Sequence, residues 1–441
     1  MTAPSGERKQ SRRCAFLLME RKRIILCLAH MSGNEMKFIE EAFADNWVVP
    51  LGPNVNGFEA DLEKFVNHRE GGRPALDKRV VALSAGTAAV QLGLLASGVE
   101  AGDEVMVQSF TFCASSHPVT YLGATPVFVD SEAETWNMDP ALLREAILDR
   151  IEKTGRKPKA IVPVYLYGMP AKIDEIMAVA EEFGIPVVED AAEGMGSLFD
   201  GQVCGTFGRY GVLSFNGNKM ITTSGGGALI CPDEASWREV MFYATQAREA
   251  YPYYQHEHIG YNYRMSNICA GIGRGQMTVL ADHIAHHKHV HAMYAELLRD
   301  VPGITLHTNP SPRYDSNYWL CNILLDPALK VVGQDDVYKE TVKGAIGGAA
   351  GVTHAAKSAR TDFEPDANVE AMRVALDKAN IESRPLWKPM HRQPVYANNP
   401  AYINGVSDSL FRRGLCLPAG PYVTDDDVRY IADTIKASIL R

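Results

Sequence analysis

The chain has 441 residues, of which 46% are hydrophobic and 22% are charged, a balance typical of a soluble globular enzyme with a sizeable core. Its formal net charge is −9, and this sign argues against a general nucleic-acid binder, which requires a basic face. A phosphate-bearing small molecule is not excluded, because a local site can be positive in an acidic protein.

The N-terminal segment contains a short apolar run, residues 14–19, which is followed by the charged sequence ERKR. This run is too short to span a bilayer or to direct export. We therefore expect residues 1–22 to form a flexible extension, and the protein to be cytoplasmic without membrane insertion. The eight cysteines form no CxxC pair, which argues against a zinc ribbon and a disulfide framework and fits a reducing compartment.

Apolar runs that predict strands follow one another along residues 23–280, with helical patterns between several of them. Near-continuous valine and isoleucine runs separated by helices are typical of strands buried on both faces, so we predict a mostly parallel sheet in an α/β fold. Ligands bind such sheets at the carboxyl ends of the strands. The predicted strands are residues 79–85, 103–112, 125–130, 159–168, 184–192, 210–215 and 225–230.

The pattern changes after about residue 280. A long helical pattern over residues 277–300 leads through a proline-rich passage to a predicted strand at 318–326. We therefore predict a large domain at 23–280 and a smaller C-terminal α/β domain at 281–441. Residues 343–367 are small, polar and without a pattern, so we expect a flexible loop there.

Two of the predicted strands end in groups suited to binding a charged ligand. Gly86, Thr87 and Ala88 form a turn before a helix, where N-terminal N–H groups favour an anion. Tight packing explains such a turn equally well. Asp190 lies near the end of another strand, where a buried carboxylate requires a partner, and we expect a cationic one. Helix capping is the alternative.

Lys219 lies between a small polar run and the glycines at 225–227. A solvent-facing loop lysine is the alternative explanation for this residue alone. Pyridoxal 5′-phosphate would use all three features together: an amine for a Schiff base, an anion site for the phosphate, and a carboxylate that keeps the ring nitrogen protonated. Phe112, at a further strand end, offers an aromatic face for the ring. We also expect positive charge close to Lys219.

Six segments share an order and spacing with one protein family: LSAGTAA, SFTFCAS, EDAAEGMGS, SFNGNKMITTSGGGAL, GYNYRMSN and RPLWKPMH. From about Arg23 to the C-terminus the chain resembles the DegT/DnrJ/EryC1/StrS family of sugar-nucleotide aminotransferases. The resemblance implies the aspartate-aminotransferase fold (fold type I), pyridoxal 5′-phosphate as cofactor, and a homodimer with shared active sites. Within the family, the chain most resembles transaminases that act on UDP-2-acetamido-2,6-dideoxy-4-hexulose, with L-glutamate as amino donor and 2-oxoglutarate as its product.

The resemblance also implies roles for matching residues. Lys219 would form the Schiff base and move the proton, Asp190 would pair with the pyridine nitrogen, and Glu193 would lie near the ring hydroxyl. Phe112 would stack on the ring. The phosphate would be held by Gly86, Thr87, Ala88 and Ser214, with Asn262 reaching in from the partner subunit, and the sugar nucleotide would be lined by Asn46, Trp47, Lys388 and His391.

Several alternatives stay open or are disfavoured by particular residues. His283, His287 and His291 share one face of a helix; we expect a solvated face and no metal, because no carboxylate or cysteine ligands accompany them. A nicotinamide-dependent dehydrogenase is disfavoured because no GxGxxG follows the first strand. A binding protein of the same fold without turnover is disfavoured by Lys219, since such a protein has no use for a Schiff-base lysine. A 3-keto sugar substrate remains an alternative, and the nucleotide stays open.

Overall fold

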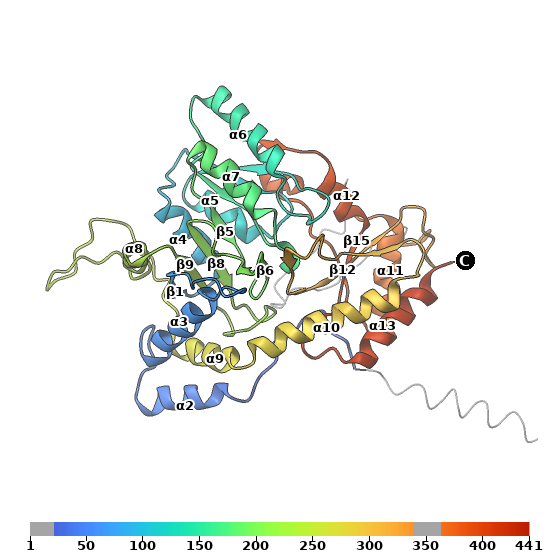
Figure 1. The fold of residues 1–441 in the computed structure, drawn as a ribbon, viewed down its shortest axis with the longest axis horizontal. Helices are drawn as coiled ribbons and strands as arrows, with labels where there is room; N and C mark the ends of the chain where they lie inside the picture. Colours follow the sequence, from blue (N-terminus) through green and yellow to red (C-terminus); the bar gives the residue numbers. More distant parts are fainter. Residues whose placement is uncertain (1–21, 338–362, 441) are drawn as a thin grey trace, which may run out of the picture.

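The structure, a computed structural model, describes residues 22–337 and 363–440. One half of the molecule is built on a large sheet (Figure 1) with the order β1-β9-β8-β5-β4-β2-β3-β14, in which bridges join the edges of β5 and β4. Among these strands only β9 runs antiparallel to its neighbours, so the predicted mostly parallel sheet is confirmed. The strands are β1 (Arg79–Leu83), β2 (Glu104–Gln108), β3 (Thr125–Val129), β4 (Ala160–Val162), β5 (Val188–Asp190), β8 (Tyr210–Ser214), β9 (Gly227–Cys231) and β14 (Ala401–Tyr402).

Both faces of this sheet are buried, as its continuous apolar strands predict. In β1, Val80 and Ala82 belong to one core cluster, whereas Val81 and Leu83 belong to the other. The first cluster is covered by α3 (Pro53–Val66), α6 (Pro140–Thr154), α7 (Ile173–Phe183) and α9 (Asn267–Met277), and the second by α4 (Gly86–Ala96), α5 (His117–Tyr121) and α8 (Glu234–Ala244).

The other half of the molecule has its own sheet, of order β10-β12-β15-β13, and all its pairs are antiparallel (Figure 1). Its strands are β10 (Ile304–Leu306), β12 (Cys321–Leu325), β13 (Arg384–Pro385) and β15 (Gly414–Leu417), and it packs with α10 (Leu280–Leu298), α11 (Ala367–Lys378) and α13 (Asp425–Ser438) around a third core cluster. Ile24 belongs to this cluster, whereas β14 joins the large sheet. The chain therefore passes between the two halves more than once, and the domain boundaries at 23 and 281 stay predictions.

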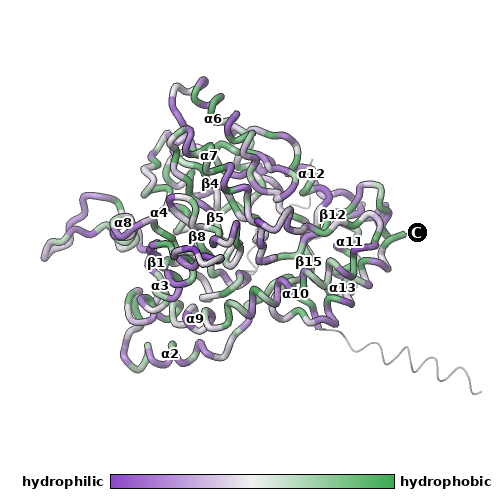
Figure 2. The backbone as a smooth tube through the Cα atoms, viewed as in Figure 1, coloured by the Kyte–Doolittle hydropathy of each residue, from purple (hydrophilic) through white to green (hydrophobic). Residues whose placement is uncertain are grey.

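Smaller elements connect these parts. Helix α2 (Glu35–Ala44) packs on α9. Figure 2 shows hydrophobic and hydrophilic residues alternating along α10, as expected of a helix with one buried face. No helix among the described residues is long and apolar enough to cross a membrane. The remaining elements are α12 (Val406–Arg413), β6 (Leu198–Phe199), β7 (Gln202–Val203), β11 (Tyr314–Asp315) and the 3₁₀ turns η1 (Cys113–Ser115), η2 (Leu166–Gly168), η3 (Met390–Arg392) and η4 (Pro394–Tyr396).

The connection between α8 and α9 projects from the body of the molecule, beyond α8 at the left of Figure 1. It exposes large side chains: Tyr254 is 78% exposed and Ile259 is 86% exposed. Apolar side chains gathered on a projecting segment are typical of a surface that contacts another chain.

Some predicted boundaries differ from the observed ones. The predicted strand 159–168 ends at Val162, because Pro163 has no N–H for the ladder and Tyr167 adopts a positive φ of 56° within a 3₁₀ turn. The expected flexible extension lies outside the described residues except for Lys22. The expected loop at 343–367 also lies largely outside them, and α11 begins at Ala367.

Candidate active site

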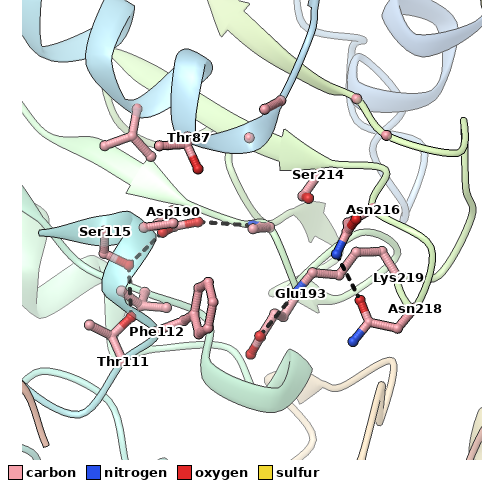
Figure 3. A pocket seen from close by; sticks show the side chains of 18 of the residues that line it. Thr87, Thr111, Phe112, Ser115, Asp190, Glu193, Ser214, Asn216, Asn218 and Lys219 are labelled. Carbon is pink, nitrogen blue, oxygen red and sulfur yellow. Dashed lines mark hydrogen bonds and ion pairs between the residues drawn. The ribbon is translucent and has the colours of Figure 1, made fainter. Parts of the chain in front are cut away.

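A cavity of about 310 Å³ opens at the carboxyl ends of β1, β2, β5 and β8 (Figure 3). This is the edge at which open α/β sheets bind ligands. Residues from distant parts of the sequence meet here because parallel strands end on the same side. Of the residues predicted for the site, those that line the cavity are Gly86, Thr87, Phe112, Asp190, Glu193, Ser214 and Lys219.

One end of the cavity is formed by the first turn of α4. This turn has no side-chain cap in the described structure, so its N–H groups remain available to an anion. A Cβ on Gly86 would lie 3.1 Å from the Cβ of Ser214, and one on Gly227 would lie 2.4 Å from the Gly86 nitrogen. Gly227 therefore permits a close backbone contact that a side chain would block, and Gly86 packs tightly against the Ser214 side chain. Thr87 and Ser214 add hydroxyl groups at the same end (Figure 3).

Asp190 is a buried carboxylate held by neutral donors. Its Oδ2 accepts a hydrogen bond of 2.6 Å from the Ser115 hydroxyl, and its Oδ1 accepts one of 3.1 Å from the Ala192 N–H. The Ser115 hydroxyl donates its hydrogen to Asp190, so in its contact with the Thr111 hydroxyl, 2.7 Å between the two oxygens, Ser115 accepts and Thr111 donates. Burial raises the pKa of Asp190 despite these donors. Among the described residues, hydroxyl and backbone groups bond to the carboxylate, and the expected cationic partner, the ring nitrogen of the cofactor, stays a prediction.

Lys219 extends into the cavity toward Glu193, and its Nζ lies 3.0 Å from the Glu193 Oε1 (Figure 3). The same Nζ lies 4.0 Å from the centroid of the Trp319 ring, within the range of a cation–π contact. Within the described part of the chain, the charged group beside Lys219 is a carboxylate and no other cationic side chain lines the cavity, so the expectation of positive charge there was wrong for these residues. Both contacts fix the amine at one place in the cavity.

Glu193 is itself buried and positioned by the backbone. Its Oε2 accepts a hydrogen bond of 2.7 Å from the Tyr167 N–H, and the Asn317 amide donates to its carbonyl at 2.8 Å. Burial raises the pKa of Glu193, and the nearby charge of Lys219 opposes this increase. The Tyr167 N–H comes from the 3₁₀ turn η2, in which this residue has a positive φ of 56°.

Aromatic rings from three separate segments line the cavity. Phe112 is 55% exposed, and its ring centroid lies 5.2 Å from that of Trp387. Trp387 in turn lies 6.4 Å from Trp319. An exposed phenyl ring in a cavity that also holds charged groups is suited to cover the face of a planar ligand.

Comparison with known proteins agrees with this arrangement. Residues 30–350 and 350–436 match the DegT/DnrJ/EryC1/StrS aminotransferase family. The chain belongs to this family. It is 40% identical to the putative pyridoxal phosphate-dependent aminotransferase EpsN of Bacillus subtilis, over 92% of this chain and 93% of that protein. It is 31% identical to GDP-perosamine synthase of Escherichia coli O157:H7, over 92% and 96% of the two chains.

The fold agrees as well. A crystal structure of a DegT DnrJ EryC1 StrS aminotransferase from Brucella abortus superposes with a TM-score of 0.76 at 27% identity, covering 92% of this chain and 95% of that one. The protein is accordingly a pyridoxal phosphate-dependent sugar aminotransferase of fold type I, and the predicted family, fold and cofactor are confirmed.

The cavity fits this cofactor at three points. The uncapped α4 turn with Thr87 and Ser214 suits a phosphate, the buried Asp190 suits a protonated ring nitrogen, and Lys219 supplies an amine. Ala88 is buried in the first turn of α4 and does not line the cavity, so only its N–H group is placed to act there.

The predicted substrate residues, and Asn262, which was predicted to reach the cofactor phosphate of the partner subunit, do not line the cavity of their own chain. Asn46 and Trp47 follow α2, where Asn46 adopts a positive φ of 57°, and Asn262 bridges to Thr245 at the base of the projecting segment. Lys388 donates to the Phe363 carbonyl at 3.3 Å. His391 is held on both ring nitrogens, by the Ser109 hydroxyl at 2.7 Å and by Asp408 at 3.1 Å. The roles of Asn46, Trp47, Lys388 and His391 toward the sugar nucleotide, and of Asn262 toward the phosphate, stay predictions.

Several cavity residues were not anticipated from the sequence. Ser115 lies within the segment SFTFCAS, so its spacing from Phe112 was available as a signal. Trp319 lies just before β12 in the other half of the molecule, and the sequence predicted only a strand there. Trp387 lies in the segment RPLWKPMH. Contacts of this kind depend on tertiary packing, which no local pattern encodes.

The three aligned histidines of α10 are buried, so the expected solvated face was wrong. His283, His287 and His291 each bond to a backbone carbonyl, those of Met220, Tyr318 and His307 respectively. The helix lies against both halves of the molecule, which removes this face from water (Figure 1). The described residues contain no group of three or more histidine, cysteine, aspartate or glutamate side chains arranged to hold a metal ion.

Burial of these histidines predicts a loss of stability in acid. Burial lowers the pKa of His287 from 6.5 to about 3, so the unfolded chain binds a proton that the folded chain does not. This contribution is fully present above pH 6.5 and declines as the pH falls toward about 3. His287→Asn retains a donor for the carbonyl but does not titrate. Between about pH 7 and about pH 5, wild type should lose about 2 kcal/mol more unfolding free energy than the variant. Urea unfolding measures this difference, and equal losses would contradict it.

Proposed function

We propose that the enzyme transfers the amino group of L-glutamate to the 4-keto carbon of a nucleotide-linked 6-deoxy sugar. The proposed substrate is UDP-2-acetamido-2,6-dideoxy-4-hexulose. The observation that carries the chemistry is the Lys219 amine, held 3.0 Å from Glu193 in the same cavity as Asp190 and the uncapped α4 turn. The sugar position and the nucleotide rest on the sequence resemblance.

The proposed roles of the cofactor-binding residues follow from their places in the cavity. When bound, the cofactor supplies an aldehyde and an electron-withdrawing ring that stabilises negative charge on the amine-bearing carbon. Asp190 pairs with the ring nitrogen and keeps it protonated, which meets the need of this buried carboxylate for a cation. Thr87, Ser214 and the α4 N–H groups bind the phosphate, and Phe112 covers one ring face.

Lys219 and Glu193 form the proton-handling pair in this proposal. Lys219 would hold the cofactor through its Nζ, and this amine, when free, would take the proton of the amine-bearing substrate carbon and hold it for return to the cofactor. Glu193 accepts a hydrogen bond from Lys219 while the Tyr167 N–H holds its other oxygen. The carboxylate thereby limits where the amine rests between transfers.

A homodimer with shared active sites completes the proposal. In this arrangement Asn262 contributes to the phosphate site of the partner subunit, and Asn46, Trp47, Lys388 and His391 line the sugar-nucleotide region. The exposed Tyr254 and Ile259 on the projecting segment support a contact with a second copy.

The proposed substrate is tested with purified protein, L-glutamate and a panel of 4-keto-6-deoxy sugars linked to UDP, GDP or dTDP. GDP is included because one relative is named GDP-perosamine synthase. We expect 2-oxoglutarate and an aminated product at the 4-position with the UDP sugar, at a kcat/KM at least about tenfold above the others.

A matching 3-keto UDP sugar serves as the control substrate. Preferential turnover of that sugar would establish the 3-keto alternative instead of the proposed function. Visible absorbance that does not change on adding L-glutamate, together with no product from any sugar, would indicate a binding protein without turnover.

A further inference from the structure

Backbone carbonyls on both sides of Lys219 are held by side chains from distant parts of the sequence. The Asn218 carbonyl accepts a hydrogen bond of 2.6 Å from the Trp319 indole N–H and one of 3.2 Å from the Cys27 thiol. The Met220 carbonyl accepts a hydrogen bond of 3.0 Å from His283. The residues before and after the lysine are therefore both anchored.

The histidine face of α10 connects these two anchors. His283 bonds to the residue that follows Lys219, and His287, one turn further along, bonds to the Tyr318 carbonyl at 3.2 Å. Tyr318 directly precedes Trp319 and adopts a positive φ of 48°. Adjacent turns of one helix thus set the positions of the segment that carries Lys219 and of the segment that carries Trp319.

Each of these histidines is used as a neutral donor. A carbonyl only accepts hydrogen bonds, so the Nδ1 atoms of His283 and His287 carry the hydrogen. Their Nε2 atoms are buried and have no hydrogen-bond partner among the described residues. Burial lowers the pKa of both histidines, which agrees with the neutral form.

Such anchoring matters because the lysine lies outside regular structure. No helix or strand is assigned between β8 and β9, and this connection includes Gly225 and Gly226. A catalytic group must be held within about 0.5 Å of its productive position, and a glycine-rich connection does not ensure this alone. The anchored carbonyls restrict the backbone, while Trp319 also presents its ring to the amine at 4.0 Å.

We propose that His283 and Trp319 are positioning residues for Lys219, acting through the carbonyls of Met220 and Asn218. They place the amine between Glu193 and the Trp319 ring before the cofactor binds. This inference rests on the proposed role of Lys219 as the site of cofactor attachment. It also gives the buried histidines of α10, which take no direct part in the proposed reaction, a role in the active site.

The test compares His283→Leu, which removes the donor, with His283→Asn, whose side-chain amide can donate in place of Nδ1. Tyr294→Phe is the control, because it removes a hydrogen bond of 3.0 Å from the same helix to the Pro418 carbonyl, away from the cavity. For each variant we measure the dissociation constant of pyridoxal phosphate, the fraction of Lys219 that borohydride traps with the cofactor, and the melting temperature without cofactor.

We expect His283→Leu to bind the cofactor about tenfold more weakly, with lower kcat and little change in KM for glutamate, as for the loss of one buried hydrogen bond. His283→Asn should return the dissociation constant to within about threefold of wild type. Tyr294→Phe should lower the melting temperature but leave cofactor affinity unchanged. Trp319→Phe, which keeps a ring but loses the donor, should behave like His283→Leu and provides a second test if that variant does not fold.

The outcomes separate this inference from the proposed function. Wild-type cofactor affinity and trapping in both His283→Leu and Trp319→Phe would overturn the positioning role. An affinity lost equally in His283→Leu, His283→Asn and Tyr294→Phe would also overturn it, since this would reflect general destabilisation. Absence of trapping at Lys219 in the wild-type protein would instead overturn the proposed function.

Discussion

Lys219→Ala is expected to lower the rate of transamination by at least about a thousandfold, because it removes both the covalent attachment point and the proton-transferring amine. In the structure this amine is placed 3.0 Å from Glu193 and over the ring of Trp319, and no other lysine among residues 22–337 and 363–440 lines the cavity. Substitution therefore leaves no other lysine amine there to take over. The measurement is single-turnover formation of 2-oxoglutarate from L-glutamate by the cofactor-loaded variant.

Lys219→Arg provides the matched control. It keeps a positive charge for Glu193 but offers no amine that can form a Schiff base under these conditions. Both variants should be inactive, whereas Lys219→Arg should melt closer to wild type, because Lys219→Ala leaves a buried carboxylate without its cation. Circular dichroism verifies the fold of each variant. Glutamate turnover by Lys219→Ala within about tenfold of wild type would refute the role of the lysine.

The large sheet could be predicted from the sequence, because its strands are buried on both faces and therefore appear as continuous apolar runs. The strand ends were predictable for the same reason: Asp190 and Ser214 each close such a run, and both line the cavity. The observed strands are shorter than the predicted ones, because apolar character continues into buried turns. The run from 159 to 168 is one example: the regular strand ends at Val162, a single bridge joins Val164 to Asp190, and the residues after it stay buried in a turn.

The electrostatic environment of the site was less predictable. In the structure, the Asp190 carboxylate accepts hydrogen bonds from Ser115 and from a backbone N–H, and these donors have no distinctive spacing in the sequence. The sequence likewise offered no reason to place Trp319 under Lys219, since the two residues meet only through packing of the two halves of the molecule. The histidines of α10 were treated as solvated because hydrophilic residues on a helix usually face water, whereas here each finds a buried carbonyl.

Asp190→Asn is expected to retain the cofactor but to lower kcat by about a hundredfold to a thousandfold, the range observed when one preorganised electrostatic group is removed. The phosphate end of the cavity, formed by Thr87, Ser214 and the α4 turn, is unchanged, so the dissociation constant of the cofactor should rise by less than about tenfold. An amide carries no charge to hold a proton on the ring nitrogen, and the electron-withdrawing ring is weakened accordingly.

Ser115→Ala separates the charge of Asp190 from its orientation. This change removes the 2.6 Å hydrogen bond to the carboxylate but leaves the negative charge and the Ala192 N–H in place. If the charge is the essential feature, Ser115→Ala should lose less than about tenfold in kcat while Asp190→Asn loses far more. The two variants are compared by kcat and by the pH titration of the absorbance of the bound cofactor. Equal losses would indicate that Asp190 acts mainly by organising the Thr111–Ser115 hydrogen bonds, and not as the partner of the ring nitrogen.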